Sequence, residues 1–253
     1  MSRVSRVFDW FYVKLKKNHI IRRILHPAAW LYKKTFSPRK KKLQRMHESV
    51  MENGLKAIEE FNIVLSNNGF RYSLAAGTML GAMREHGFIK HDVDIDTIMW
   101  IDEFNPSLYG LLEKAGFKLV HSFSIGDGTL GKEDTFEKYG VQIDLFYICN
   151  PLEKNGYPYF CDFNPYPDCG SWEQSVRVHG GVMPRRIDIP AAHDVMLVTF
   201  ENIQLPVFTN AHECLLFRYG EDYMIPNPQW KDRNNPHVKA WPEQVASYDT
   251  YVH

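Results

Sequence analysis

Cysteine is scarce in this chain of 253 residues, which has four of them and no Cys-x-x-Cys pair. So few and so widely spaced cysteines do not make a disulfide scaffold, and they favour reduced thiols. Cys161, Cys169 and His179 have the composition of a structural zinc site, but their spacing matches none of the standard zinc patterns. The sequence therefore leaves zinc binding undecided.

Long apolar runs are absent as well. No stretch approaches the ~18 residues of a membrane-spanning helix. The N-terminus lacks the clean apolar segment and the small-residue cleavage site of a signal peptide, so we expect a cytoplasmic protein. Hydrophobic residues make up 44% and charged residues 24% of the chain, a composition that excludes disordered and fibrous proteins and allows a real core.

A net charge is missing, because 30 basic and 30 acidic residues cancel. Their distribution is uneven: residues 1–47 hold fourteen of the basic residues and one acid. Across residues 1–36, Trp, Phe and Ile alternate with Lys and Arg at near-helical spacing, as in helices that lie on anionic membranes. A helix packed on the rest of the protein is an alternative. Nucleic-acid binding is disfavoured, since the remaining chain is acidic and shows no basic groove.

This asymmetry predicts two parts. A basic amphipathic arm would cover residues 1–42 and end in a linker at Ser37–Pro38 and the run 39–42. A folded domain would cover residues 43–253. Through residues 1–36 the protein would bind peripherally to the inner face of the cell membrane, with no nucleic acid as partner.

Apolar spacing predicts the elements of the folded part. Spacings near three and four predict a helix that begins at Leu43 and stops at residues 67–69. The elements predicted after it are a short strand over 72–76, buried strands over 92–101 and 141–148, a hairpin over 195–208, and a helix from Thr209 or Asn210 through Arg218.

Three carboxylates alternate with apolar residues in Asp92-Val93-Asp94-Ile95-Asp96. On a strand this alternation puts all three on one face, where like charges repel unless a cation binds. Hard oxygen ligands favour Mg²⁺ or Mn²⁺, which usually also contacts substrate phosphate. A solvated polar face is the alternative. The pattern predicts a metal site at Asp94 and Asp96.

Two further segments add polar residues to this candidate site. Asp144 is the one acid in the apolar stretch 141–148, where an unpaired carboxylate is costly. If the two strands are neighbours, Asp144 completes a carboxylate triad; otherwise it is an edge-strand acid facing water. Gly77 and Thr78 lie between a predicted strand and a helix, where free N–H groups suit a phosphate. An ordinary turn is the alternative, and this is not a Walker loop because no Gly-Lys-Ser/Thr follows.

The order of these motifs resembles the LicD/fukutin family of phosphotransferases. The matching residues read Gly77-Thr78-Met79-Leu80-Gly81-Ala82, then Arg84, then Gly87-Phe88-Ile89 and Asp92-Val93-Asp94-Ile95-Asp96. The stretch from Tyr219-Gly220 to Tyr223 and Pro226 resembles the end of the family's domain. Two departures bear on the choice of donor or acceptor: Lys90 replaces a proline, and His91 replaces the tryptophan before Asp92.

The resemblance implies an α/β (α+β) fold with a nucleotidyltransferase-like mixed sheet flanked by helices. It implies transfer of a phospho-alcohol group, such as phosphocholine, from a CDP-linked donor to a sugar hydroxyl of a cell-surface glycan or a glycolipid such as lipopolysaccharide. In such an enzyme Asp94, Asp96 and Asp144 would be catalytic and would bind Mg²⁺ (or Mn²⁺). The residues that would bind substrate are Gly77, Thr78, Arg84, His91 and Arg185.

Two rival functions remain at this point. A nucleotidyltransferase that moves NMP from an NTP to a small molecule would use the same triad. A non-enzymatic membrane-surface interaction protein would use residues 1–36 alone. The Gly87-Phe88-Ile89 loop favours the phospho-alcohol transferase over the first rival. The repelling carboxylates argue against the second, because an adaptor has no use for them.

Overall fold

The computed structural model describes residues 38–227, 230 and 235–251. Contacts divide the chain between Arg45 and Met46 into two units, and the account below concerns the second unit except for the bounds of the first helix. The membrane-binding segment predicted over residues 1–36 lies outside the described residues, so its role stays a prediction. Within the described ranges, no helix is both long and apolar enough to cross a membrane.

The first described helix, α3, runs from Pro38 to Asn67. The prediction of a linker over residues 38–42 was wrong, because these residues form the first turns of α3. Proline is well suited to the first helical position, where no N–H partner is needed, and Lys and Arg favour helices. Leu43, expected on the apolar face, is exposed. The helix ends where predicted, and Gly69 follows it with φ +77°.

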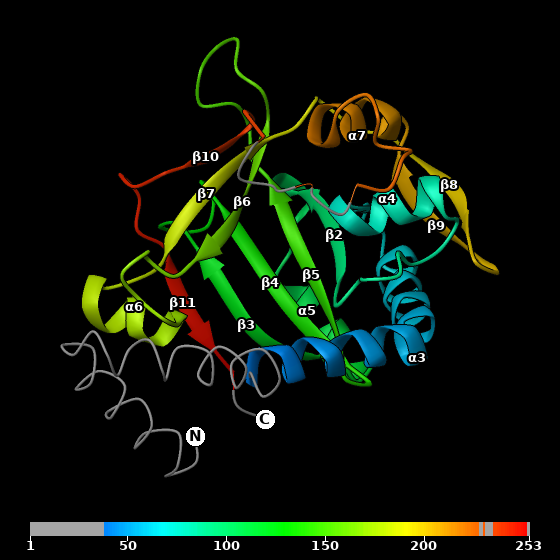
Figure 1. Cartoon of the computed structure of the whole chain (residues 1–253), viewed down its shortest axis with the longest axis horizontal. Coiled ribbons are helices and arrows are strands. Elements are labelled where there is room, and N and C mark those ends of the chain that lie inside the picture. Colours follow the sequence, from blue (N-terminus) through cyan, green and yellow to red (C-terminus); the bar gives the residue numbers. More distant parts are fainter. Residues whose placement is uncertain (1–37, 228–229, 231–234, 252–253) are drawn as a thin grey trace, which may run out of the picture. The chain divides into compact units, whose positions relative to one another are not determined.

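A six-stranded mixed sheet follows, in the order β1-β2-β5-β4-β3-β11. Strands β2 and β5 are parallel, and every other neighbouring pair in this sheet is antiparallel. Figure 1 shows β2 and β5 side by side, with α4 next to β2. The strands are β1 (Ser73–Leu74), β2 (Ile95–Trp100), β3 (Lys118–Ser124), β4 (Lys132–Lys138), β5 (Val141–Ile148) and β11 (Ser247–Thr250).

The other elements surround this sheet. A three-stranded antiparallel sheet has the order β10-β7-β6, and β8 and β9 form a hairpin. Their bounds are β6 (Tyr159–Asn164), β7 (Met183–Asp188), β8 (Val195–Phe200), β9 (Ile203–Phe208) and β10 (Val238–Ala240). The helices are α4 (Ala76–Arg84), the 3-10 turn η1 (Ile101–Glu103), α5 (Ser107–Lys114), α6 (Trp172–His179) and α7 (Ala211–Tyr219).

Several predicted elements are confirmed. Strand β5 has the predicted bounds, the hairpin turns at residues 201–202, and α7 begins after Asn210 and ends before Gly220. The strand predicted over 72–76 is shorter, since only Ser73 and Leu74 pair with β2. A mixed sheet flanked by helices is the predicted α/β class, which is therefore confirmed.

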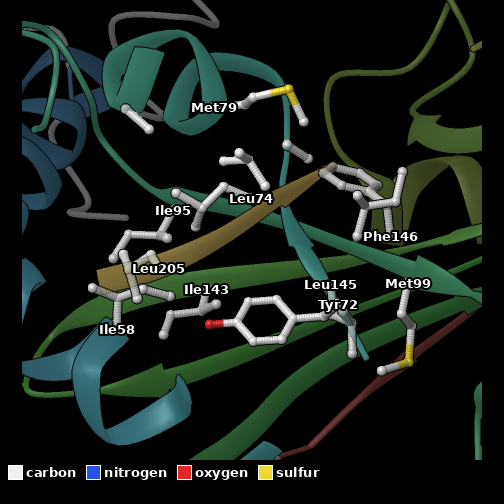
Figure 2. Packing of buried hydrophobic residues seen from close by; sticks show 14 of the residues in the cluster. Ile58, Tyr72, Leu74, Met79, Ile95, Met99, Ile143, Leu145, Phe146 and Leu205 are labelled. Carbon is white, nitrogen blue, oxygen red and sulfur yellow. The ribbon is translucent and has the colours of Figure 1, made fainter. Parts of the chain in front are cut away.

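The core lies between α3 and the sheet. Phe61 of α3 is fully buried, and its ring contacts those of Tyr72, Phe117 and Phe136. Figure 2 shows Ile58 of α3 close to Ile143 of β5 and Leu205 of β9. Each such buried side chain contributes ~1.5–3 kcal/mol relative to exposure. This packing holds β2 and β5 in a fixed register.

Candidate active site

The acidic run reaches the sheet later than the sequence pattern predicts. Strand β2 begins at Ile95, so Asp92 and Asp94 precede it in a loop. The prediction that all three carboxylates alternate along one strand was wrong for these two. The reason is a local turn: the Asp92 N–H donates to the Ile89 carbonyl (3.0 Å), and Asp92 Oδ2 accepts from the Ile89 N–H (2.7 Å).

Asp96 and Asp144 lie opposite each other on β2 and β5. They are register partners in the parallel pair, so both side chains point to the same face of the sheet. Neighbouring strands lie ~4.8 Å apart. Asp144 Oδ1 accepts a hydrogen bond of 2.5 Å from the Thr135 hydroxyl on β4. The structure thus brings together the two acids that are separated by nearly fifty residues in the sequence.

The start of α4 is bound to Asp96. The Gly77 N–H donates to Asp96 Oδ2 (3.2 Å), and Thr78 Oγ1 accepts from the Asp96 N–H (2.9 Å). Thr78 is buried, so its side chain positions β2. Ala76, just before Gly77, has φ +40°, which is strained for a residue with a Cβ. A backbone held in this way keeps the first turn of α4 directed at the carboxylates.

Burial and mutual repulsion make these acids unusually weak. Burial, with the charges of Asp94 and Asp144, raises the pKa of Asp96 well above its usual value, and Arg218 acts in the opposite direction. Burial and Asp94 raise the pKa of Asp144 to about 7. Burial also raises the pKa of Asp94, and it raises the pKa of Asp92 to about 6. Full ionisation of this group therefore requires positive charge from elsewhere.

Sequence reasoning missed a further buried acid of this group, Glu133 on β4. Its Oε2 atom is buried without a hydrogen-bond partner. Burial is the largest cause of its raised pKa, and the negative charges of Asp144 and Asp162 raise the pKa further. Glu133 shares a strand face with Thr135, which contacts Asp144, so it belongs to the acidic face of the sheet.

The neighbouring Asp134 points to the opposite face and is structural. Its carboxylate accepts hydrogen bonds from Ser122, Tyr109 and Tyr147 and an ion pair from Lys132. Two consecutive buried acids thus have opposite environments, one saturated with donors and the other facing carboxylates.

Arg218 was also missed as a site residue, although it closes the predicted helix α7. Its charge lowers the pKa of Asp96. It lines a pocket beside the start of α4 together with Ala75, Ala76, Phe160, Ile187 and Asp188. The pocket therefore combines apolar walls with a cation near the carboxylates.

The structure places the remaining predicted residues less centrally. Arg84 donates hydrogen bonds to the Tyr223 carbonyl (3.2 Å) and to the Glu85 carboxylate (2.9 Å). Its positive charge acts to lower the pKa of Asp92, against the effect of burial. His91 is exposed in the turn before Asp92. Arg185 on β7 forms a two-pronged ion pair with Asp162 on β6. The Arg185 guanidinium therefore already has a partner in the three-stranded sheet. The charge of that partner, Asp162, raises the pKa of Glu133.

Close backbone contacts explain two glycines of the motif region. A Cβ on Gly81 would clash with the Gly87 carbonyl oxygen, so α4 and the Gly87-Phe88-Ile89 loop can touch only through glycine. A Cβ on Gly54 of α3 would lie 2.9 Å from the Phe88 ring. These contacts fix the loop that leads into Asp92.

The donor set of the acidic triad suits a hard divalent cation such as Mg²⁺. In the present arrangement Asp96 and Asp144 accept hydrogen bonds from Gly77 and Thr135. Another group of three side chains, Asp168, Cys169 and His179, has ligand atoms that all lie within 4.8 Å of one another. Among the described residues, this close spacing is found for that group and not for the acidic triad. Binding at the triad would therefore require the ligand atoms of Asp94, Asp96 and Asp144 to move closer together.

Taken together, the mixed sheet, the paired acids and the glycine-led helix define a nucleotidyltransferase-like domain. Residues 69–148 match the family model "LicD/FKTN/FKRP, nucleotidyltransferase domain". The chain therefore contains a domain of the LicD/fukutin family, and the resemblance seen in the sequence is confirmed.

Two curated relatives extend the match. The chain is 34% identical to "Uncharacterized protein T07A5.1" of Caenorhabditis elegans over 104 residues, which are 40% of this chain and 27% of that protein. It is 31% identical to "Ribitol-5-phosphate transferase FKTN" of Mus musculus over 196 residues, which are 73% of this chain and 38% of that protein. The chain thus spans well under half the length of either relative.

Proposed function

We propose that this chain is a metal-dependent phosphotransferase that moves a phospho-alcohol group from a CDP-linked donor to a sugar hydroxyl of a glycan or glycolipid. The main support is the register pairing of Asp96 with Asp144 beside the N–H of Gly77. The mouse relative's name describes a ribitol 5-phosphate transferase, so ribitol 5-phosphate joins phosphocholine as a candidate group.

The triad would perform the phosphoryl transfer. Asp94, Asp96 and Asp144 would hold Mg²⁺ or Mn²⁺, which supplies charge neutralisation for phosphoryl transfer when bound. The acceptor oxygen forms a bond to the donor phosphorus while the bond from phosphorus to CMP breaks. The two roles of Asp144 are alternatives: it would either share the metal or stay off it and take the proton of the acceptor hydroxyl, a role that suits its metal-free pKa of about 7.

The pocket beside α4 would hold the cytidine part of the donor only after widening, because its present volume of about 30 Å³ has room for a few water molecules. Phe160 and Ile187 provide apolar walls, and Arg218 lies where it would meet phosphate oxygens near Asp96. The first turn of α4 offers N–H groups at Gly77 and Thr78, which suit an anion. Arg84, His91 and Arg185 remain candidate substrate contacts, with Arg185 first required to leave Asp162.

A nucleotidyltransferase that moves NMP is the second candidate, because the matched family model describes a nucleotidyltransferase domain. The two reactions differ in which phosphorus is attacked and in the donor. CTP would be the donor for the second, whereas a CDP-alcohol would serve the first and release CMP.

A thermal-shift screen followed by product analysis separates these functions. CDP-ribitol, CDP-choline, CDP-ethanolamine, CDP-glycerol and CTP are each added with and without Mg²⁺. The proposal expects a CDP-alcohol to raise the melting temperature in the presence of Mg²⁺ and to release CMP when a sugar acceptor is added. Response to CTP alone with NMP transfer would establish the second candidate instead. Asp249 is an exposed acid on the edge strand β11. The variant Asp249→Asn is the control for loss of an acid outside the site, and it should behave as wild type in both measurements.

A further inference from the structure

A second cluster of metal-type side chains lies at helix α6, separate from the acidic face of the main sheet. Asp168 and Cys169 precede α6, and His179 is its last residue. One ligand atom from each of the three lies within 4.8 Å of the others. His179 Nε2 is 2.9 and 3.1 Å from the two Asp168 oxygens, and Cys169 Sγ is 3.6 Å from Asp168 Oδ1.

The surrounding backbone holds these side chains in place. The Cys169 N–H donates to the Tyr166 carbonyl (2.8 Å), and the Tyr166 N–H donates to the Ser175 hydroxyl on α6 (3.1 Å). The Tyr166 ring stacks on the His179 imidazole, with ring centroids 4.2 Å apart. The loop is thus folded back along the helix, and the imidazole is oriented toward Asp168.

The composition of the cluster differs from that of the acidic triad. Thiolate sulfur, imidazole nitrogen and carboxylate oxygen are the three ligand types of zinc in proteins, with distances of about 2.0–2.3 Å. In a tetrahedral site these lengths put neighbouring ligand atoms roughly 3.3–3.8 Å apart, and the Asp168 contacts are already in or below that range. A mixed sulfur and nitrogen set is a poor match for Mg²⁺, which prefers oxygen.

The ligand set also differs from the one suggested by the sequence. Cys161 is fully buried on β6, and its Sγ approaches the Leu130 carbonyl at 3.9 Å. It belongs to a second buried apolar cluster, with Phe123, Tyr159 and Phe163, and not to the group of metal-type side chains. Asp168 replaces it, because the loop before α6 carries Asp168 and Cys169 together to the helix end.

We propose that Asp168, Cys169 and His179 form a binding site for a zinc-type divalent transition-metal ion, with solvent as the fourth ligand. The partly exposed side chains of His179 and Asp168, at 31% and 63% of their maximum, give an ion access from solvent. The ion would close the loop before α6 onto the helix end, on the connection that leads from β6 to β7. Closure of this kind restricts the loop without adding apolar contacts.

Cobalt provides a direct test, because thiolate-bound Co²⁺ absorbs in the near ultraviolet and carboxylate-bound Co²⁺ does not. The full chain is stripped with a chelator and titrated with Co²⁺ and then with Zn²⁺. The site predicts a thiolate-to-cobalt band that saturates at one ion per chain and disappears when Zn²⁺ is added. Cys169→Ser should abolish the band, and His179→Gln and Asp168→Asn should each weaken cobalt binding at least tenfold.

Three controls keep this test specific. Cys214→Ser changes a buried thiol outside the cluster, and His193→Gln changes an exposed histidine that stacks on Trp100; both should retain the band. Asp94→Asn should also retain it while losing phosphotransfer, so that failure of the proposed function and failure of this site are distinguishable. A wild-type chain without the band, or a Cys169→Ser variant that keeps it, overturns the proposal.

Discussion

Asp96 on β2 and Asp144 on β5 are register partners in a parallel pair of strands, so their carboxylates lie on one face of the sheet. Their charges repel each other and that of Asp94, and burial raises the pKa of each. The fold thus maintains an arrangement that is unfavourable without a cation. This cost of holding the acids together leads to the predictions on the acidic face.

Asp94→Asn and Asp96→Asn should each lower phosphotransfer at least ~10²-fold, the size expected when a preorganised transition-state contact is lost. Removing one carboxylate relieves repulsion, so the melting temperature of the metal-free protein should hold or rise slightly. Transfer assays in saturating Mg²⁺ and thermal melts in a chelator measure the two effects. Near wild-type activity in either variant would remove the metal assignment.

Metal-free stability should depend on pH through Asp144. Its pKa is raised from 3.8 to about 7 in the folded state, so the folded protein binds the proton more tightly than the unfolded chain does. The associated stability is present below the unfolded pKa and is lost as pH rises through the folded pKa. At 1.36 kcal/mol per pKa unit, the rise from 3.8 to about 7 corresponds to a total loss of about 4 kcal/mol.

Urea unfolding in a chelator at about pH 5 and about pH 8 tests this dependence. Asp144→Asn keeps an oxygen for the Thr135 hydroxyl and removes the charge. The variant should therefore lose less stability than wild type over this interval. An equal loss in both proteins would show that Asp144 does not titrate as described.

Glu133 and Asp134 provide a matched pair of substitutions. Folding at neutral pH must either bury the Glu133 charge beside other acids or make this side chain bind a proton, because its pKa is raised well above the usual value. Glu133→Gln removes this cost and should stabilise the metal-free protein. Asp134→Asn removes the partner of buried Lys132, and breaking a buried ion pair typically costs 3–5 kcal/mol. Chemical denaturation should give effects of opposite sign. Destabilisation by Glu133→Gln as large as that by Asp134→Asn would place Glu133 among the structural acids.

Gly81→Ala should disturb the loop before Asp92. The new Cβ would clash with the Gly87 carbonyl, and an overpacked contact of this kind costs about 1–3 kcal/mol. Gly110→Ala on α5 is the control, since a Cβ there meets nothing within 4 Å and alanine favours a helix. Thermal melts should show a loss for the first variant and no loss for the second. Equal melting temperatures would mean that the loop adapts freely.

Deletion of residues 1–36 should leave activity on soluble substrates and reduce binding to anionic liposomes. The segment holds nine basic residues, and each cation near an anionic surface contributes ~1 kcal/mol. Binding of the full chain should therefore weaken steeply with salt. Co-sedimentation with liposomes at low and high salt measures this. Unchanged binding after the deletion would refute the membrane role, and a misfolded product would favour a packed helix.

Local patterns were sufficient for much of the fold. Alternation defined β5, the turn residues located the β8–β9 hairpin, and Asn210 and Gly220 marked the ends of α7. These features depend on residues that are only a few positions apart in the chain, so they can be predicted from the sequence alone. The order of the Gly77, Arg84 and Asp94 motifs likewise identified the family before any contact was known.

Tertiary contacts decided the rest. Which strands are neighbours, and in which register, depends on the packing of α3 against the sheet, so the pairing of Asp96 with Asp144 required the folded chain. The turn at Asp92 displaced two acids from the strand, and the smaller sheet engaged Arg185 with Asp162. The sequence determined which acids, thiols and imidazoles are present. Only long-range packing decided which of them meet, because two groups distant in the chain interact strongly only when the fold removes the water between them.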